Sequence, residues 1–396
     1  MSHGESPKIE VFACQLLKLE PDFQNLLFEF EGEGGKYAEW LNSLKKNPPY
    51  LPLLSALMVS GPISDPRLEK YFTSLRLNFL ESVNSTPHYQ MSREEENFYC
   101  ALAEQCFVNE YVYYQTPEEI DLSIVMRNRL IQVIDDREVA SPTLMIAVAC
   151  YFPLYTLKHS DRLLTQNHSK HLMSVLRQQI EYPLEEIKLK RSIPALTDLG
   201  GEVTLAVQDQ YEENPYPRWV RLPYASNTNY LNFYISKKYP KSNFTPLANE
   251  KNLEVLIAGC GTGQHPIICS QVITGANILA VDLSMSSLAY AKRKTIEMGI
   301  SSIEYAQADI LKIASLGREF DVIESVGVLH HLQQPFEGWK ALLSVLKPNG
   351  LMRVGLYSEL GRKDITKIRK LINQEGIRPT PGSIRNYRNY LLNLKT

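Results

Sequence analysis

No hydrophobic run in this 396-residue chain reaches the roughly 18 residues that a membrane-spanning helix requires. The first residues, MSHGESPKIE, contain no apolar core of the kind found in secretion signals. The six cysteines stand at positions 14, 100, 106, 150, 260 and 269, without a CxxC pair or a Cys/His cluster at zinc spacing. These absences predict a cytoplasmic protein with reduced thiols, no membrane partner and no metal site.

A strong excess of either charge is also missing, because 42 Lys and Arg face 44 Asp and Glu, for a net charge of −2. A nearly neutral chain has no long-range attraction to nucleic acid, so a nucleic-acid partner is not expected. Basic residues do gather in the last segment, residues 361–396. Its Tyr387 and Tyr390 could contact phosphates, but a solvated helix is the favoured interpretation.

Strand signals are almost absent from residues 1–190. Ser92 with Glu95, and Thr116 with Glu119, have the spacing of capping boxes at helix starts. Apolar residues recur at helical spacing in Phe12–Leu19, Leu51–Met58, Leu68–Leu80, Phe98–Val108 and Ile120–Ile134. The region therefore predicts an all-α domain of paired helices. No clean 34-residue self-similarity is found, so a true repeat array is the minority interpretation.

The most informative segment is LEVLIAGCGTGQHP, which begins at Leu253. An apolar run ends at Ala258, a glycine loop follows, and helix-forming sequence comes next, which predicts a buried parallel strand, a loop close to a ligand, and a helix. Nineteen residues after Gly263, a second apolar run ends at Asp282. A carboxylate at that spacing receives the ribose hydroxyls in Rossmann-type sites. The pattern therefore predicts a nucleoside site.

Two other kinds of phosphate site are excluded by their missing residues. A dinucleotide loop needs a third glycine in GxGxxG, but Gly263 is followed by Gln264, His265 and Pro266. The chain also contains no GxxxxGK[ST] phosphate loop. The nucleoside is therefore not expected to be a dinucleotide or a nucleoside triphosphate held by a P-loop.

The loop resembles motif I of class I S-adenosylmethionine-dependent methyltransferases, and later segments agree with that family in order. These are a third strand over 302–306, an adenine-binding segment over 307–310, a fourth strand over 320–326, VLHHL over 328–332, and KPNG over 347–350 turning into a fifth strand over 351–357. The resemblance covers residues 251–360. It implies an α/β fold, in which a Rossmann-like class I methyltransferase domain is preceded by an all-α helical domain.

The resemblance also implies a domain plan and a cofactor, S-adenosylmethionine. The helical region, residues 1–190, is similar to the one found beside tetratricopeptide repeats in some bacterial methyltransferases. It is followed by a Pro/Tyr-rich bridge or lid over 191–250, the cofactor-binding domain over 251–360, and the basic helical tail over 361–396. The residues implied for the cofactor are Gly259, Cys260, Gly261, Thr262, Gly263, Asp282, Leu283, Asp309, Ile310, Glu324 and Val326, with Tyr211 and Tyr216 from the bridge.

One position departs from the family. Class I methyltransferases commonly carry Asp or Glu two residues before the first glycine, near the amino group of methionine, and this chain has Ile257 there. Glu212, Glu213 and Glu324 are the candidates for the missing carboxylate. The first two lie in the bridge, whose proline-stiffened aromatics suit a lid over the ligand because they lose little entropy on ordering. An interdomain strap is the alternative.

The chemistry requires alignment of the acceptor, exclusion of water and, for oxygen or acidic carbon acceptors, removal of a proton. His330 and His331 are the candidate bases, because imidazole titrates near neutral pH and both follow the fourth strand at the carboxyl edge of the sheet. The VLHHL segment is most similar to small-molecule methyltransferases of the quinone-biosynthesis type. A protein or RNA methyltransferase, and a non-catalytic S-adenosylmethionine-binding protein, remain alternatives.

The strand count is short for the family, whose sheets normally have seven strands. The sequence after the fifth predicted strand reads as helical, with no final hairpin. The uncovered sheet edge would be a pairing liability. Either the chain is truncated, or the N-terminal domain or a partner is expected to cover the edge. A homodimer is a separate possibility.

Overall fold

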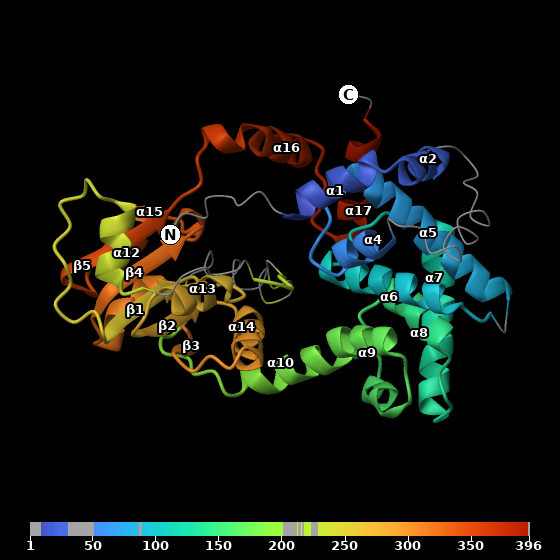
Figure 1. The fold of residues 1–396 in the computed structure, drawn as a ribbon, viewed down its shortest axis with the longest axis horizontal. Coiled ribbons are helices and arrows are strands. Elements are labelled where there is room, and N and C mark those ends of the chain that lie inside the picture. The colour runs from blue at the N-terminus through green and yellow to red at the C-terminus, as the bar shows by residue number, and fades with distance from the viewer. Residues whose placement is uncertain are drawn as a thin grey trace. The chain divides into compact units, whose positions relative to one another are not determined.

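The computed structural model in Figure 1 describes residues 9–30, 51–86, 89–200, 212, 215, 218–222 and 229–394. The chain forms two compact units, of which the first comprises Met1–Leu184 with Glu375–Thr396 and the second Glu185–Gln374. We call them the helical unit and the sheet unit. Residues 361–396, expected as one tail, are divided between the two.

The helical unit consists of helices in all its described parts. They are α1 (Ile9–Leu19), α2 (Pro21–Phe30), α4 (Leu51–Met58), α5 (Pro66–Ser85), α6 (Arg93–Val108), α7 (Pro117–Asp135), α8 (Pro142–Ala149), η1 (Leu154–Thr156), η2 (Ser160–Thr165), α9 (Lys170–Leu176), η3 (Arg177–Glu181), the start of α10 (Tyr182–Lys190), and α17 (Pro381–Asn393). Each of the five predicted helical segments lies within one of these helices, so the predicted helical region is confirmed.

Both predicted capping boxes are present. Ser92 Oγ accepts a hydrogen bond from the Glu95 amide at 3.2 Å, and the Ser92 amide donates to Glu95 Oε2 at 2.6 Å. Thr116 and Glu119 form the same reciprocal pair at the start of α7. Each box satisfies amide groups that have no partner within the first helical turn, which is why both helices begin where the sequence indicated.

The helix α17 is tied to the helical unit by arginines. Arg388 Nη2 donates to Glu69 Oε2 at 2.6 Å, and Arg385 Nε donates to the Tyr111 carbonyl at 2.8 Å. No residue of α17 is buried. Its residues are exposed or partly buried, and Arg385 and Arg388 are used in contacts within the chain.

The sheet unit contains five parallel strands in the order β3-β2-β1-β4-β5. They are β1 (Leu253–Ala258), β2 (Ala276–Asp282), β3 (Ile303–Gln307), β4 (Phe320–Val326) and β5 (Leu346–Gly355). This is the Rossmann-like arrangement, so the predicted fold class is confirmed. Among the described residues, no strand pairs with the outer edge of β5.

The beginning of β5 differs from the prediction. Lys347–Gly350 was expected as a turn before the strand, but Leu346 already pairs with Phe320. Pairing then shifts and resumes at Leu351 with Val322. Asn349 takes a positive φ of 63°, which Asn tolerates better than most residues. The turn-like sequence therefore forms an irregularity inside the strand.

Helices cover both faces of this sheet. One face carries Leu256, Leu279 and Ile323, which belong to one buried cluster with Leu342 of α15 and Ile313 of η4. On the other face, α13 packs against β2 and β3, and α14 does the same. The helical elements of this unit are the rest of α10, α12 (Leu231–Lys238), α13 (Gln264–Val272), α14 (Met285–Glu297), η4 (Ile310–Leu316), η5 (Leu329–His331), α15 (Pro335–Leu343), η6 (Leu360–Arg362) and α16 (Lys363–Gln374).

Parts of the bridge, residues 191–250, attach to this unit. Ala195 pairs with Gln307 beside β3, and Asn229 pairs with Ile273 ahead of β2. The bridge therefore contacts both the carboxyl and the amino ends of strands. In the described ranges, no helix is long and apolar enough to span a bilayer.

Candidate functional site

The glycine loop after β1 turns the chain from the sheet into α13. The amides of Gly259 and Cys260 both donate to the Val281 carbonyl, at 2.8 and 2.9 Å. Gly259, Gly261 and Gly263 have positive φ angles of 77°, 53° and 85°. Side chains with a Cβ are strained in that region, so the loop needs glycine for its backbone path.

Two of these glycines also allow close packing. A Cβ on Gly259 would stand 2.3 Å from Val328 Cγ2, and one on Gly263 would stand 2.4 Å from Ala291 Cβ. Gly259 therefore brings the loop against the segment that follows β4, and Gly263 brings the start of α13 against α14. The neighbouring Thr262 is buried.

Asp282 ends β2 and faces the glycine loop. Its Oδ2 accepts from the Gly261 amide at 2.8 Å, and its Oδ1 accepts from the Ser284 amide at 3.0 Å. Burial raises the pKa of the Asp282 carboxyl above its ordinary value, and interactions with the backbone amides of Ser284, Gly261 and Leu283 oppose that rise. The next residue, Leu283, presents its carbonyl to Gln307 Nε2 at 2.7 Å. The predicted neighbours Gly261 and Asp282 are thus in direct contact.

The segment after β3 is buried beside the bridge. The Asp309 amide donates to Thr197 Oγ1 at 2.8 Å, and Asp309 Oδ1 accepts from the Leu311 amide at 2.9 Å. Asp309 therefore begins η4, and Ile310 next to it is buried. The sequence placed Gln307 in the predicted adenine-binding segment but did not indicate Thr197, whose partner Asp309 lies far away along the chain.

The end of β4 carries a buried carboxylate. Glu324, 5% exposed, accepts through Oε2 from His265 Nε2 and from Arg353 Nη1, the latter at 3.2 Å. Burial by itself would raise the pKa of Glu324, but the bond and charge of His265, helped by Arg353, hold it at about 2. Val326, at the end of the strand, is partly buried. Arg353 was not predicted, since β5 has no motif there.

The two candidate bases follow β4 in η5. The His330 ring lies 3.9 Å from the Tyr357 ring and 4.3 Å from the His331 ring, between centroids. Both His330 nitrogens are buried and have no hydrogen-bond partner in the described part of the chain. Burial lowers the pKa of His330, and His331 and Arg362 lower it further. His331 is more exposed than His330, and partial desolvation of its ring, together with the charges of Arg362 and Arg369, lowers its pKa too.

The bridge reaches the same region through Trp219 and Glu212. Trp219 Nε1 donates to the Thr262 carbonyl in the glycine loop at 3.0 Å. Glu212 Oε2 accepts from the Ser286 amide at 2.9 Å, at the start of α14. The predicted cofactor residues Tyr211 and Tyr216, and the candidate Glu213, lie outside the described residues. The described part of the bridge thus contacts the glycine loop and the start of α14.

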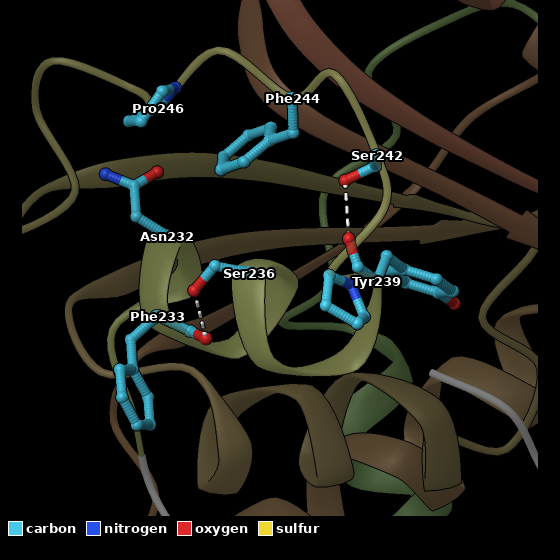
Figure 2. Close-up of a pocket in the computed structure, with 8 residues that line it drawn as sticks. Asn232, Phe233, Ser236, Tyr239, Ser242, Phe244 and Pro246 are labelled. Atoms are coloured by element: carbon cyan, nitrogen blue, oxygen red, sulfur yellow. Dashed lines mark hydrogen bonds between the residues drawn. The ribbon is translucent and has the colours of Figure 1, made fainter.

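A pocket of about 330 Å³ lies elsewhere in this unit, against α12 and the loop after it (Figure 2). Its two serine hydroxyls are used locally, because Ser236 donates to the Phe233 carbonyl and Ser242 to the Tyr239 carbonyl. None of the predicted site residues lines it. Among the described residues, no group of three or more His, Cys, Asp or Glu is arranged to hold a metal ion.

Residues 255–350 match the model of a family described as a methyltransferase domain. A Synechococcus protein described as uncharacterised is 38% identical over 119 residues, which are 30% of this chain and 28% of that protein. A ubiquinone biosynthesis O-methyltransferase of Bartonella bacilliformis is 28% identical over 124 residues, or 31% of this chain and 48% of that enzyme. A malonyl-[acyl-carrier protein] O-methyltransferase of Halalkalibacterium halodurans is 33% identical over 117 residues, or 29% and 41%.

The chain therefore spans less than half the length of these relatives. The family match runs from β1 into β5 and includes the glycine loop, Asp282 and the end of β4. Together with the Rossmann-like sheet, it identifies this part of the chain as a class I, S-adenosylmethionine-dependent methyltransferase domain.

Proposed function

We propose that this chain, which carries a class I methyltransferase domain, transfers a methyl group from S-adenosylmethionine to an oxygen atom of a small molecule. The observation that carries the proposal is the direct bond between the glycine loop and Asp282, at the carboxyl edge where open α/β sheets bind ligands. The oxygen acceptor is supported by two relatives, a ubiquinone biosynthesis and a malonyl-[acyl-carrier protein] O-methyltransferase.

The residues present fit the cofactor's nucleoside. A carboxylate offers about four acceptor positions, and backbone amides occupy two of those of Asp282. The remaining capacity suits a pair of ribose hydroxyls. Gly261, whose positive φ favours glycine, has no side chain and so permits a ligand to approach the loop backbone. Leu283, Asp309 and Ile310 follow β2 and β3 at the same sheet edge, and we assign them to the adenine side.

The other predicted cofactor residues take supporting roles in this proposal. Cys260 and Thr262 are buried within the loop, and Val326 ends β4 beside it. Trp219 holds the loop through the Thr262 carbonyl. Tyr211 and Tyr216 stay predictions as residues of a lid that excludes water.

When bound, S-adenosylmethionine supplies an electrophilic methyl group on a good leaving group. The chain must then align an acceptor hydroxyl and remove its proton. We assign proton removal to His330, because both its nitrogens lack partners in the described chain and its lowered pKa keeps the ring neutral at pH 7. His331 packs against that ring and helps to position it.

Calorimetric titration with S-adenosylhomocysteine tests the cofactor site. Asp282→Ala removes the acceptor for the ribose hydroxyls and should weaken binding by about 1.5–3 kcal/mol, roughly ten- to a hundredfold. Asn277→Ala, near the other end of β2, is the matched control and should bind like the parent. A parent chain that does not bind, or an Asp282 variant that folds and binds equally well, would contradict the assignment.

The acceptor is tested separately with a panel of phenols, carboxylic acids and amines, using mass spectrometry to detect the methylated product. Methylation of phenols or carboxylic acids is the expected result. If only amines, or a protein or RNA, are methylated, the proposed small-molecule oxygen acceptor is wrong, and the cofactor assignment still holds.

A further inference from the structure

The residue two positions before the first glycine, Ile257, cannot provide the negative charge that related domains have there. Its neighbour across the sheet can. In the register of β1 and β4, Ile257 pairs with Glu324. Residues that pair between adjacent strands point to the same face of a sheet. The Glu324 carboxylate is therefore on the same face and at the same level as the missing one, displaced by one strand.

The Glu324 carboxylate is held in place but not fully used. Both bonds to it, from His265 and from Arg353, end on Oε2. For Oε1, no partner is found within the described ranges. Oε1 is not among the buried side-chain atoms without a partner in the described chain, so it keeps some contact with solvent. A cationic or N–H-bearing ligand could therefore reach it and use the acceptor that the chain leaves free.

The other described candidate is already occupied. Glu212 Oε1 accepts from Lys190 Nζ at 2.6 Å, and its Oε2 accepts from the Ser284 hydroxyl and the Ser286 amide. These partners place Glu212 at the start of α14, after Asp282 and on the ribose side of the loop. It has no comparable free oxygen.

We infer that Glu324 supplies the carboxylate that receives the amino group of the cofactor's methionine portion, in place of the residue at 257. His265 and Arg353 are positioning residues, because each fixes Oε2 and thereby the direction of Oε1. His265 belongs to the first turn of α13, directly after the glycine loop, so the carboxylate is tied to the loop itself. This inference rests on the proposed function.

The test uses two ligands that differ only in the methionine portion. S-adenosylhomocysteine has the amino group, and 5′-methylthioadenosine keeps the nucleoside and lacks it. Glu324→Gln preserves shape and removes the charge, so it should weaken S-adenosylhomocysteine binding about ten- to a hundredfold, as expected for a lost bond to a charged group. Binding of 5′-methylthioadenosine should be unchanged. Asp321→Asn, the same change near the amino end of β4, should affect neither ligand.

A carboxylate moved to position 257 should restore the binding that Glu324→Gln loses. Ile257→Asp introduced into Glu324→Gln returns a carboxylate to the family's usual position and should recover most of the lost affinity for S-adenosylhomocysteine. A ligand-side measurement covers the case in which Glu324→Gln does not fold. Binding of desamino-S-adenosylhomocysteine to the parent chain should be weaker than binding of S-adenosylhomocysteine by the same factor.

The outcomes separate this inference from the proposed function. If the parent chain binds neither nucleoside, the proposed function fails. If it binds both, the inference is overturned by a Glu324→Gln variant that loses both ligands equally or neither. It is equally overturned by a parent chain that does not distinguish the desamino compound.

Discussion

The two units of this chain each bury a glutamate beside an arginine, and the two glutamates are used differently. In the helical unit, Glu119 Oε1 accepts from Arg76 and from the Tyr151 hydroxyl, and Oε2 accepts from the Thr116 amide. In the sheet unit, both partners of Glu324 share Oε2. Both side chains are almost fully buried. The difference lies in whether the chain itself uses both oxygens.

The comparison separates polar groups that hold the fold from those kept for a ligand. A buried group whose partners are all within the chain contributes to stability, and its loss leaves those partners exposed to the full desolvation cost. A carboxylate with an oxygen that the chain does not use can also receive a ligand, which is the role we infer for Glu324. Trp219 belongs with Glu119, because its N–H bonds to Thr262, whereas His330 belongs with Glu324.

The largest effect is expected at Glu119. Glu119→Gln leaves the fully buried Arg76 guanidinium without a charge partner and should destabilise the helical unit by about 3–5 kcal/mol. Denaturant unfolding followed by amide hydrogen exchange measures it. Glu118→Gln, the same change at the exposed neighbouring position, should be close to neutral. Equal stability of the two variants would show that this pair does not hold the fold.

His330 should show the opposite behaviour, with lost turnover and little change in stability. His330→Gln removes the proton acceptor and should lower kcat by about a hundredfold, the low end for general base catalysis. Because the pKa of His330 is lowered, the parent's kcat/KM should rise with pH through a value below 6.5 and stay level at neutral pH. The variant should lose that rise. A parent-like pH profile in the variant would assign the base elsewhere.

The bonds that His265 and Arg353 make to Glu324 Oε2 should stabilise the sheet unit, and this stabilisation should depend on pH. The folded pKa of Glu324, about 2, lies below the unfolded value near 4.5, so this stability is complete above pH 5 and is lost as pH falls. Between pH 6 and 3 the parent should lose about 2 kcal/mol more than Glu324→Gln. Calorimetric melting across that range measures the difference. Parallel curves would mean that the bonds to His265 and Arg353 contribute nothing.

The smallest effect is expected at Trp219. Trp219→Phe keeps the ring against Tyr290 but removes the donor to the Thr262 carbonyl, which should cost about 1 kcal/mol of stability. Trp339→Phe, in α15, makes the same change where the described chain offers no hydrogen bond, and thermal melting compares the two. A larger loss of stability in Trp339→Phe than in Trp219→Phe would show that the smaller ring, and not the lost hydrogen bond, causes the destabilisation.

Much of the sheet could be predicted from the sequence because its strands are short apolar runs with polar or glycine ends. The bounds of β1 and β4 and the end of β2 agree with the prediction, and β3 is shifted by one residue toward the C-terminus at both ends. The predicted start of β5 at residue 351 was wrong, because Pro348, Asn349 and Gly350 are residues typical of a turn. Pairing of Leu346 with Phe320 continues the strand past them, and the sequence contains no signal for that contact.

The site was predictable only in its local part. The glycine loop and Asp282 have a fixed spacing because one βα unit links them, so the sequence by itself determined that they meet. Thr197 with Asp309, and Trp219 with Thr262, join segments separated by more than 40 residues. Local pattern cannot determine such pairs, because each depends on how a bridge segment packs after the sheet has formed.

The sequence by itself thus determined the class of fold, the loop and the absence of a carboxylate at Ile257. Only the tertiary structure shows that Glu324 pairs with Ile257 on the neighbouring strand, which is the basis for our inference among the three candidate glutamates. That placement depends on the parallel register of β1 and β4, although 61 residues separate the end of β1 from the start of β4. It also depends on the contacts from His265 in α13 and Arg353 in β5, which direct the Glu324 side chain. Register is a property of the assembled sheet, so no single segment of the sequence specifies it.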